Sequence, residues 1–201
     1  MAETTTGRRE RKKAQTRQAL ADAAMRLFTE RGFDSVGVRE VAEAADVSLS
    51  TLFKHFPSKE ALVFDLDADV ESALVAAVRD RASGQPVLHA LRDHLVHTRT
   101  AVRTDDPTFV LVESTPALRD YARRMWSRHE KALAATLADA TGLAPDDLAV
   151  TGLARFAVEA PSLARASDDP ARAIRDLFAL LEHGWATTPL VRQEDRPGQD
   201  G

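Results

Sequence analysis

Three groups of side chains have types and spacings that could do chemistry. Six of the basic residues lie between Arg8 and Arg17, a charge density that favours phosphate, although many basic tails are only solvated and charge alone leaves both readings open. A second group, from Ser48 to Phe56, collects hydroxyl, lysine and histidine side chains. The third consists of three histidines between residues 89 and 97, which could face a ligand or hold a metal ion.

The second group lies in a region whose apolar spacing predicts three helices. Apolar residues recur every three or four positions from Gln15 to Phe28, and Gly32 is expected to end this helix. A helix of about two turns follows from Val38 to Ala45, and a third runs over 49–56, capped by Ser48, with Leu52 and Phe56 facing inward. Two short helices joined by a tight turn, the second exposing polar side chains, are typical of a DNA-binding helix-turn-helix, although any small helical hairpin shows part of this pattern.

Further helices are predicted over 59–81, 86–104, 106–113, 116–140, 146–165 and 170–187, each break placing Pro at a helix start or Gly at a helix end. Pro161 is expected to kink its helix or cut it short near Ala160. Residues 189–201 show no periodicity and are expected to be disordered. An all-α fold follows.

Composition limits the classes of protein and the kinds of site that are possible for this chain. The 201 residues are 44% apolar, enough for a buried core, and contain no cysteine, which excludes disulfides and thiolate metal sites. No long uncharged apolar run is present, so we expect a cytoplasmic protein with no membrane partner. The net charge of −4 divides unevenly: residues 1–60 carry eleven basic and nine acidic groups, or +2, which leaves −6 for the remainder.

The stretch from Thr16 to Leu62 closely resembles the N-terminal domain of TetR-type transcriptional regulators, and it reads TRQALADAAMRLFTERGFDSVGVREVAEAADVSLSTLFKHFPSKEAL. The resemblance covers about a quarter of the chain. It implies a homodimeric repressor with a three-helix DNA-binding domain and a helical domain for ligand binding and dimerisation. We expect a basic flexible arm over 1–14, the helix-turn-helix domain over 15–57, the regulatory domain over 58–188 and the tail from 189.

The resemblance also implies the partners and the DNA contacts. The expected partners are a double-stranded palindromic operator, an unknown small-molecule effector and a second copy of the chain. Ser50, Thr51 and Lys54 are the best candidates for base edges or adjacent phosphates, and His55 and Lys59 for the DNA backbone. The full set of expected DNA contacts is Arg17, Ser35, Gly37, Val38, Ser48, Leu49, Ser50, Thr51, Phe53, Lys54, His55 and Lys59.

Three positions depart from the family pattern. Gly37 stands where a hydroxyl residue usually caps the second helix and touches phosphate, so that contact must come from Ser35, from backbone amides, or be absent. Phe53 replaces a common tyrosine, which removes a phosphate hydrogen bond but leaves an apolar contact with a thymine methyl possible. Asp46 replaces the usual turn glycine, which we expect the fold to tolerate because Asp visits left-handed geometry more readily than most residues.

The C-terminal two thirds offers a candidate pocket and a candidate dimer interface. The pocket candidates are His94, His97, Phe109, Met125, Trp126, His129 and Phe156, large or polar side chains of the kind that line ligand cavities in helical bundles. The interface candidates, on the last two helices, are Leu153, Phe156, Leu163, Ile174, Leu177, Phe178 and Leu181. The His94 and His97 pair lacks a recognisable ligand motif, so no metal and no cofactor are expected.

No phosphate-cradling glycine loop, nucleophile elbow, HExxH or calcium-loop motif is present in the sequence, and paired aspartates coincide with helix starts, where capping explains them. We therefore expect no enzyme. One alternative is a DNA-binding protein whose C-terminal domain responds to a protein partner or to no ligand. The other is a helical small-molecule-binding protein or enzyme with a non-functional DNA-reading head.

Overall fold

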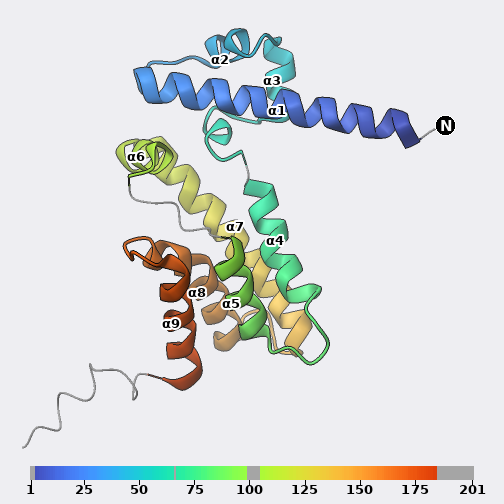
Figure 1. Ribbon diagram of the computed structural model, residues 1–201, viewed down its shortest axis with the longest axis vertical. Helices are drawn as coiled ribbons and strands as arrows, with labels where there is room; N and C mark the ends of the chain where they lie inside the picture. Colours follow the sequence, from blue (N-terminus) through green and yellow to red (C-terminus); the bar gives the residue numbers. More distant parts are fainter. Residues whose placement is uncertain (1–2, 66, 99–104, 185–201) are drawn as a thin grey trace, which may run out of the picture. The chain divides into compact units, whose positions relative to one another are not determined.

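The computed structural model describes residues 3–65, 67–98 and 105–184, and within these ranges the secondary structure is entirely helical (Figure 1), which confirms the all-α class. The elements are α1 Glu3–Arg31, α2 Val38–Ala44, α3 Leu49–His55, the 3-10 helix η1 Glu60–Leu62, α4 Asp67–Arg79, α5 Val87–Thr98, α6 Pro107–Ser114, α7 Pro116–Thr141, α8 Leu148–Ala164 and α9 Pro170–His183. None of these helices combines the length and the apolar character needed to cross a membrane.

The described residues form two compact units. The first unit takes its residues from Met1–Ser72 and Thr104–His129, and the second from Ala73–Arg103 and Glu130–Gly201. The expected division after residue 57 is not tested by this grouping and stays a prediction.

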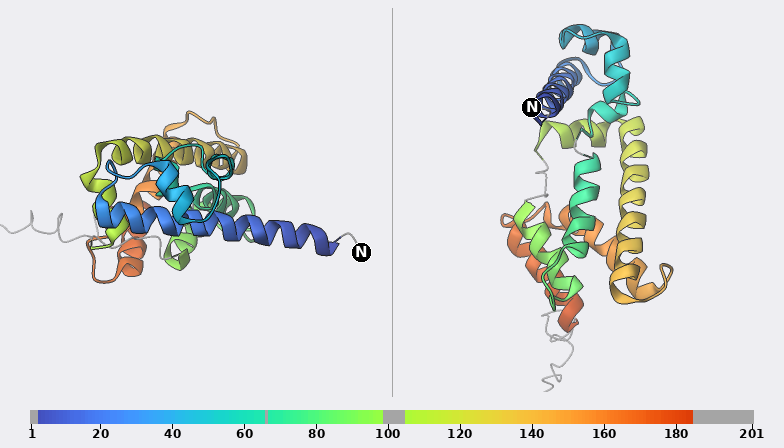
Figure 2. Two further views of the ribbon diagram at one scale, coloured as in Figure 1. Left: turned by 90° about the horizontal axis from the view of Figure 1, so that it is seen from above. Right: turned by 90° about the vertical axis from the view of Figure 1, so that its right-hand side faces the viewer.

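The core of the first unit joins α1, α2, α3 and η1. Leu20 and Phe28 of α1, Val41 of α2, Leu52 of α3 and Leu62 of η1 are each fully buried. Two views show α2 and α3 lying against the C-terminal half of α1 (Figures 1 and 2). The predicted inward positions of α3, Leu52 and Phe56, are therefore confirmed, and burial of these two side chains fixes which face of α3 is left outside.

The turn between α2 and α3 explains how aspartate replaces glycine. Asp46 has φ of 53°, in the left-handed region. Its amide donates to the Glu43 carbonyl at 3.1 Å, and the Val47 amide donates to the Ala42 carbonyl at 3.0 Å. These two bonds form a Schellman motif, in which the residue after the C-cap must be left-handed. The expectation that Asp46 is tolerated is confirmed.

Two predicted boundaries of the first unit were wrong. Helix α1 begins at Glu3 rather than near Gln15, so the described part of the expected flexible arm is helical. The predicted helix over 59–81 is instead η1 followed by α4. Tertiary contacts interrupt it: Phe64 stacks on Tyr121 with ring centroids 5.2 Å apart, and Arg17 holds the carbonyl of Asp65.

In the second unit, α9 packs against both α5 and α8 (Figure 1). Leu91, Ala157 and Phe178 are fully buried in this unit. Of the two effects expected of Pro161, an end of the helix near Ala160 was wrong, because α8 continues to Ala164, and a kink stays a prediction. Residues 99–104 and 185–201 lie outside the described part of the chain, and the expected disordered tail lies among them.

Candidate nucleic-acid interface

The outer face of α3 presents most of the side chains expected to contact DNA. Ser50 and Lys54 are exposed, Phe53 is 49% exposed, and Thr51 is half-buried. No acidic residue occurs between Val47 and Pro57. The face therefore offers hydroxyl donors and acceptors, one cation and one apolar ring, which are the groups that can read base edges in a major groove.

Ser48 organises the start of this face. Its hydroxyl accepts a hydrogen bond from the Thr51 amide at 3.1 Å, which caps α3. The same oxygen lies 2.9 Å from the Ser50 hydroxyl and 2.8 Å from the Thr51 hydroxyl. The three hydroxyl groups are thus held together in one cluster at the N-terminus of the helix, where a phosphate is also favoured by the helix dipole.

The start of α2 is occupied by a carboxylate from its own helix. Gly37 is the N-cap of α2, and its amide donates to Glu40 Oε2 at 2.7 Å. Arg31 pairs with the same carboxylate at 2.8 Å. The Gly37 amide bond and then the Arg31 hydrogen bond hold the pKa of Glu40 below its usual range. The Gly37 amide is therefore engaged by Glu40, and no side chain of residue 37 caps the first turn of α2, while Ser35 is exposed and Val38 packs against the core.

Arg17 is turned inward as a clamp on the end of α3. Its guanidinium donates to the carbonyl of His55 at 3.1 Å and to the carbonyl of Asp65 at 2.5 Å, and it pairs with the Asp65 carboxylate at 2.6 Å. It also lies 4.6 Å from the centre of the Phe56 ring. With these partners, Arg17 positions the C-terminus of α3, and its use as a phosphate contact remains a prediction.

Lys59 is likewise engaged within the unit. Its ammonium donates to the Phe33 carbonyl at 2.5 Å and lies 4.2 Å from the centre of the Phe33 ring and 5.6 Å from that of Phe28. Burial lowers the pKa of Lys59, against the opposing charges of Asp34 and other carboxylates. Lys59 thus fastens the turn after α1, and the phosphate contact expected of it remains a prediction.

His55 lies where α3 meets α1. Its side chain is half-buried, and its Nδ1 is buried without a hydrogen-bond partner among the described residues. Burial and then the charges of Arg17 and Lys13 lower the pKa of His55. In the absence of DNA, the lowered pKa therefore favours the neutral imidazole at neutral pH.

Arg39 and the exposed cations of α1 lie outside the set of individually expected DNA contacts. Arg39 is exposed on α2. On α1, every residue from Gly7 to Gln15 is exposed, including five of the six cations of the basic run. The basic run is visible in the sequence, but a flexible arm would give its residues no fixed direction, so individual contacts could not be predicted from it.

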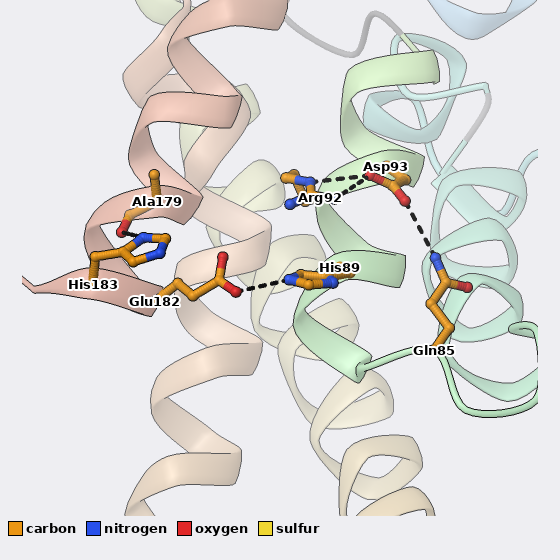
Figure 3. A network of polar contacts seen from close by, with 7 residues as sticks. All are labelled: Gln85, His89, Arg92, Asp93, Ala179, Glu182 and His183. Atoms are coloured by element: carbon orange, nitrogen blue, oxygen red, sulfur yellow. Dashed lines mark hydrogen bonds and ion pairs between the residues drawn. The ribbon is translucent and has the colours of Figure 1, made fainter.

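Within the second unit, a polar network joins α5 to α9 (Figure 3). His89 Nε2 lies 2.9 Å from Glu182 Oε1, and this contact holds the pKa of Glu182 below its usual range. Beside it, Asp93 receives hydrogen bonds from Arg92 and Gln85. A groove of about 280 Å³ adjoins the network, lined by Arg92, Asp93, Val96, His97, Arg175, Ala179 and Glu182.

The expected pocket residues fall in different places. Met125 and His129 are buried in the first unit, where the rings of His129 and Trp126 form a T-shaped pair with centroids 5.1 Å apart and His129 Nε2 lies 3.8 Å from Glu71 Oε2. Phe109 is half-buried in the same unit. In the second unit, the remaining candidates are His94, which is half-buried, His97, which lines the groove, and Phe156, which packs on Phe178. One shared pocket for all seven stays a prediction.

The expected interface residues divide by burial. Ile174 and Phe178 are each 1% exposed within the single chain, so they belong to its own core and leave no surface for a partner. Leu163 and Leu181 are 59% and 47% exposed, and Leu153, Phe156 and Leu177 are half-buried. No cluster of three or more histidine and carboxylate side chains suited to a metal ion occurs among the described residues.

Sequence comparison relates the chain to known regulators. The family model described as bacterial regulatory proteins, tetR family, matches residues 20–66. The transcriptional regulator TcmR of Streptomyces glaucescens is 32% identical over 152 residues, which cover 70% of this chain and 67% of TcmR. The regulator AcrR of Shigella flexneri is 31% identical over 102 residues, and the matched region spans about half of each chain, 49% and 47%.

Solved structures share the fold. GusR of Salmonella enterica superposes with a TM-score of 0.55 at 21% identity, covering 84% of this chain and 94% of its own. FadR of Thermus thermophilus, a TetR-family repressor solved with lauroyl-CoA, gives 0.52 at 22% identity, covering 92% and 100%. These two likenesses establish the helical architecture of the chain.

Proposed function

The chain belongs to the tetR family of bacterial regulatory proteins and is a DNA-binding transcriptional regulator, and we propose that it acts as a ligand-responsive homodimeric repressor of a palindromic operator. The observation that carries the proposal is the exposed face of α3. Its hydroxyl cluster and Lys54 are held outward because Leu52 and Phe56 are buried beneath them. Each subunit would lay this face in a major groove.

The side chains of α3 would make different kinds of contact with the bases of the operator. Lys54 and Ser50 are exposed and carry the donors that major-groove readout requires. The Thr51 hydroxyl is hydrogen-bonded to the Ser48 hydroxyl. It would therefore contact a base in the orientation that this bond fixes. Phe53, exposed beside them, offers an apolar surface for a thymine methyl group.

Lys54→Ala provides the sharpest test of this assignment. DNA recovered by selection from genomic fragments would be titrated with the parent protein, with Lys54→Ala and with Lys131→Ala. Lys131 is exposed on α7 in the second unit and serves as a charge-matched control. We expect Lys54→Ala to lose about 1–3 kcal/mol of specific binding, or about 5- to 150-fold, and Lys131→Ala to bind like the parent. Equal binding by all three proteins would remove α3 from the site.

A small-molecule effector would regulate DNA binding by binding more tightly to a conformation of the dimer in which the two helix-turn-helix domains are not aligned for the operator. Its influence on DNA binding can be no greater than its differential affinity for the two states. FadR of Thermus thermophilus was solved with lauroyl-CoA, which motivates including acyl-CoA compounds in the metabolite panel. A compound that releases the parent protein from its operator supports the proposal. If no compound in the panel changes operator binding, a regulator whose C-terminal domain responds to a protein partner is favoured.

Dimerisation would use the exposed apolar side chains of α8 and α9. Leu163 and Leu181 are the most exposed of the expected interface residues, with Leu153, Leu177 and Phe156 partly available beside them. Sedimentation at micromolar concentration should give a dimer for the parent and a shift toward monomer for Leu163→Asp. A monomeric parent would leave the palindromic operator without a physical basis, since operator symmetry mirrors protein symmetry. We place the protein in the cytoplasm, where its operator lies.

A further inference from the structure

Residues 7–15 of α1 form a helical segment whose described side chains are all exposed. Every residue from Gly7 to Gln15 is exposed, and the first buried side chain of α1 is Leu20. Two views show α1 continuing well past α3 toward its N-terminus (Figures 1 and 2). A helical segment that is polar all round and short gains little from tertiary packing, so its stability must come from another source.

Repulsion between like charges destabilises this helical segment when no anion is bound to it. Arg9 and Lys13 are four residues apart, as are Arg8 and Lys12, and like charges at this spacing destabilise a helix. Among the described side chains, none forms an ion pair with these four cations. Phosphates bound along this segment would attract the four cations and offset their mutual repulsion.

One row of these cations leads directly to the reading helix. Arg9, Lys13 and Arg17 follow one another at four-residue spacing, so they share one face of α1. Arg17 on this row hydrogen-bonds the His55 carbonyl at the end of α3. Arg11, at 100° per residue, lies about 160° around the helix from Lys13 and belongs to the opposite face.

We propose that Arg9 and Lys13 bind phosphates of operator DNA flanking the segment read by α3. This inference rests on the proposed function, because it requires α3 to dock on DNA. The row from Arg17 to Arg9 spans about 12 Å at 1.5 Å per residue, which corresponds to about three to four base pairs along one strand. Each subunit therefore extends its footprint by that length without reading additional bases.

The test compares two double variants that each remove two positive charges. Arg9→Gln/Lys13→Gln removes the proposed contacts, and Arg11→Gln/Lys131→Gln removes exposed cations from the far face of α1 and from α7. Dissociation constants for the selected operator would be measured from 50 to 300 mM salt. We expect the slope of log K against log[salt] to become shallower by about 1.8 per subunit in the first variant, at about 0.9 per phosphate, and to stay parental in the second.

Two controls keep the result interpretable. Arg9→Lys/Lys13→Arg keeps both charges and should restore the parental slope, and thermal unfolding of all variants should match the parent because these side chains are exposed. Amide hydrogen exchange over residues 7–15 should slow when operator is added. A parental slope in Arg9→Gln/Lys13→Gln, or equal losses in both double variants, overturns the inference while leaving the function of α3 standing. A parent protein that binds no sequence specifically overturns both.

Discussion

Replacing Arg17 by alanine should lower the free energy of unfolding in the absence of DNA. The guanidinium bonds three groups on two residues of the first unit: the carbonyl of His55 at 3.1 Å, the carbonyl of Asp65 at 2.5 Å and the carboxylate of Asp65 at 2.6 Å. It also covers the Phe56 ring at 4.6 Å. Alanine removes all four contacts and leaves the Asp65 carboxylate, whose side chain is 16% exposed, without its cation.

The magnitude lies between the limits for exposed and buried ion pairs. An exposed pair contributes about 0–1 kcal/mol, and breaking a buried pair costs about 3–5 kcal/mol. The Arg17 side chain is 36% exposed, so solvent screens part of the interaction. We expect a loss of about 2 kcal/mol, or a fall in Tm of roughly 4–8 °C for a chain of this length.

Urea and thermal unfolding at one fixed protein concentration would measure this loss, with Arg39→Ala as the matched control. Arg39 is an exposed arginine of the same unit, and its removal should change the free energy by less than about 0.5 kcal/mol. If Arg17→Ala unfolds like the parent and instead shows a shallower salt dependence of DNA binding, the clamp role is refuted and Arg17 is a phosphate contact.

Three further substitutions test the local structure. Lys59→Ala should lower Tm, because the Phe33 carbonyl loses its donor, and parental stability would contradict this role; a shallower salt slope in the same variant would confirm the phosphate contact expected of Lys59. Asp46→Val should cost about 1–2 kcal/mol and Asp46→Gly almost nothing in chemical unfolding, because a β-branched residue is strained at φ of 53°; equal costs would contradict the left-handed turn. Burial lowers the pKa of His94, so the unfolded chain binds the proton first as pH falls below about 6.5. The parent should therefore lose more stability between pH 7 and pH 5 than His94→Gln does, and identical pH profiles would refute this.

The sequence predicted the reading head better than the rest of the chain because local signals determine it. Gly32 ends α1, Ser48 caps α3, and the apolar pair Leu52 and Phe56 is buried as its spacing required. The type and order of the helices followed from the same rules, and the other boundaries within the described residues were correct within a few residues apart from α1 and the segment after α3. The predicted helix ends at 104 and 187 lie outside the described part of the chain.

Residues whose roles depend on tertiary contacts could not be predicted in this way. Arg17 and Lys59 look like surface cations in the sequence, yet each bonds a backbone carbonyl distant along the chain, 38 and 26 residues away. The break between η1 and α4 has the same origin, since the Arg17 bond to Asp65 has no local signature. Likewise, the apolar stripe of α9 did not reveal that Ile174 and Phe178 face the interior of the chain itself.

Selection of genomic fragments by the purified protein tests the central claim most directly. A dimer that docks two α3 helices should enrich a palindrome with half-sites about one helical turn apart, or a multiple of that distance, bound with a steep salt dependence. Enrichment of no sequence, with weak and uniform binding to all fragments, would contradict the claim and direct attention to the groove between α5 and α9.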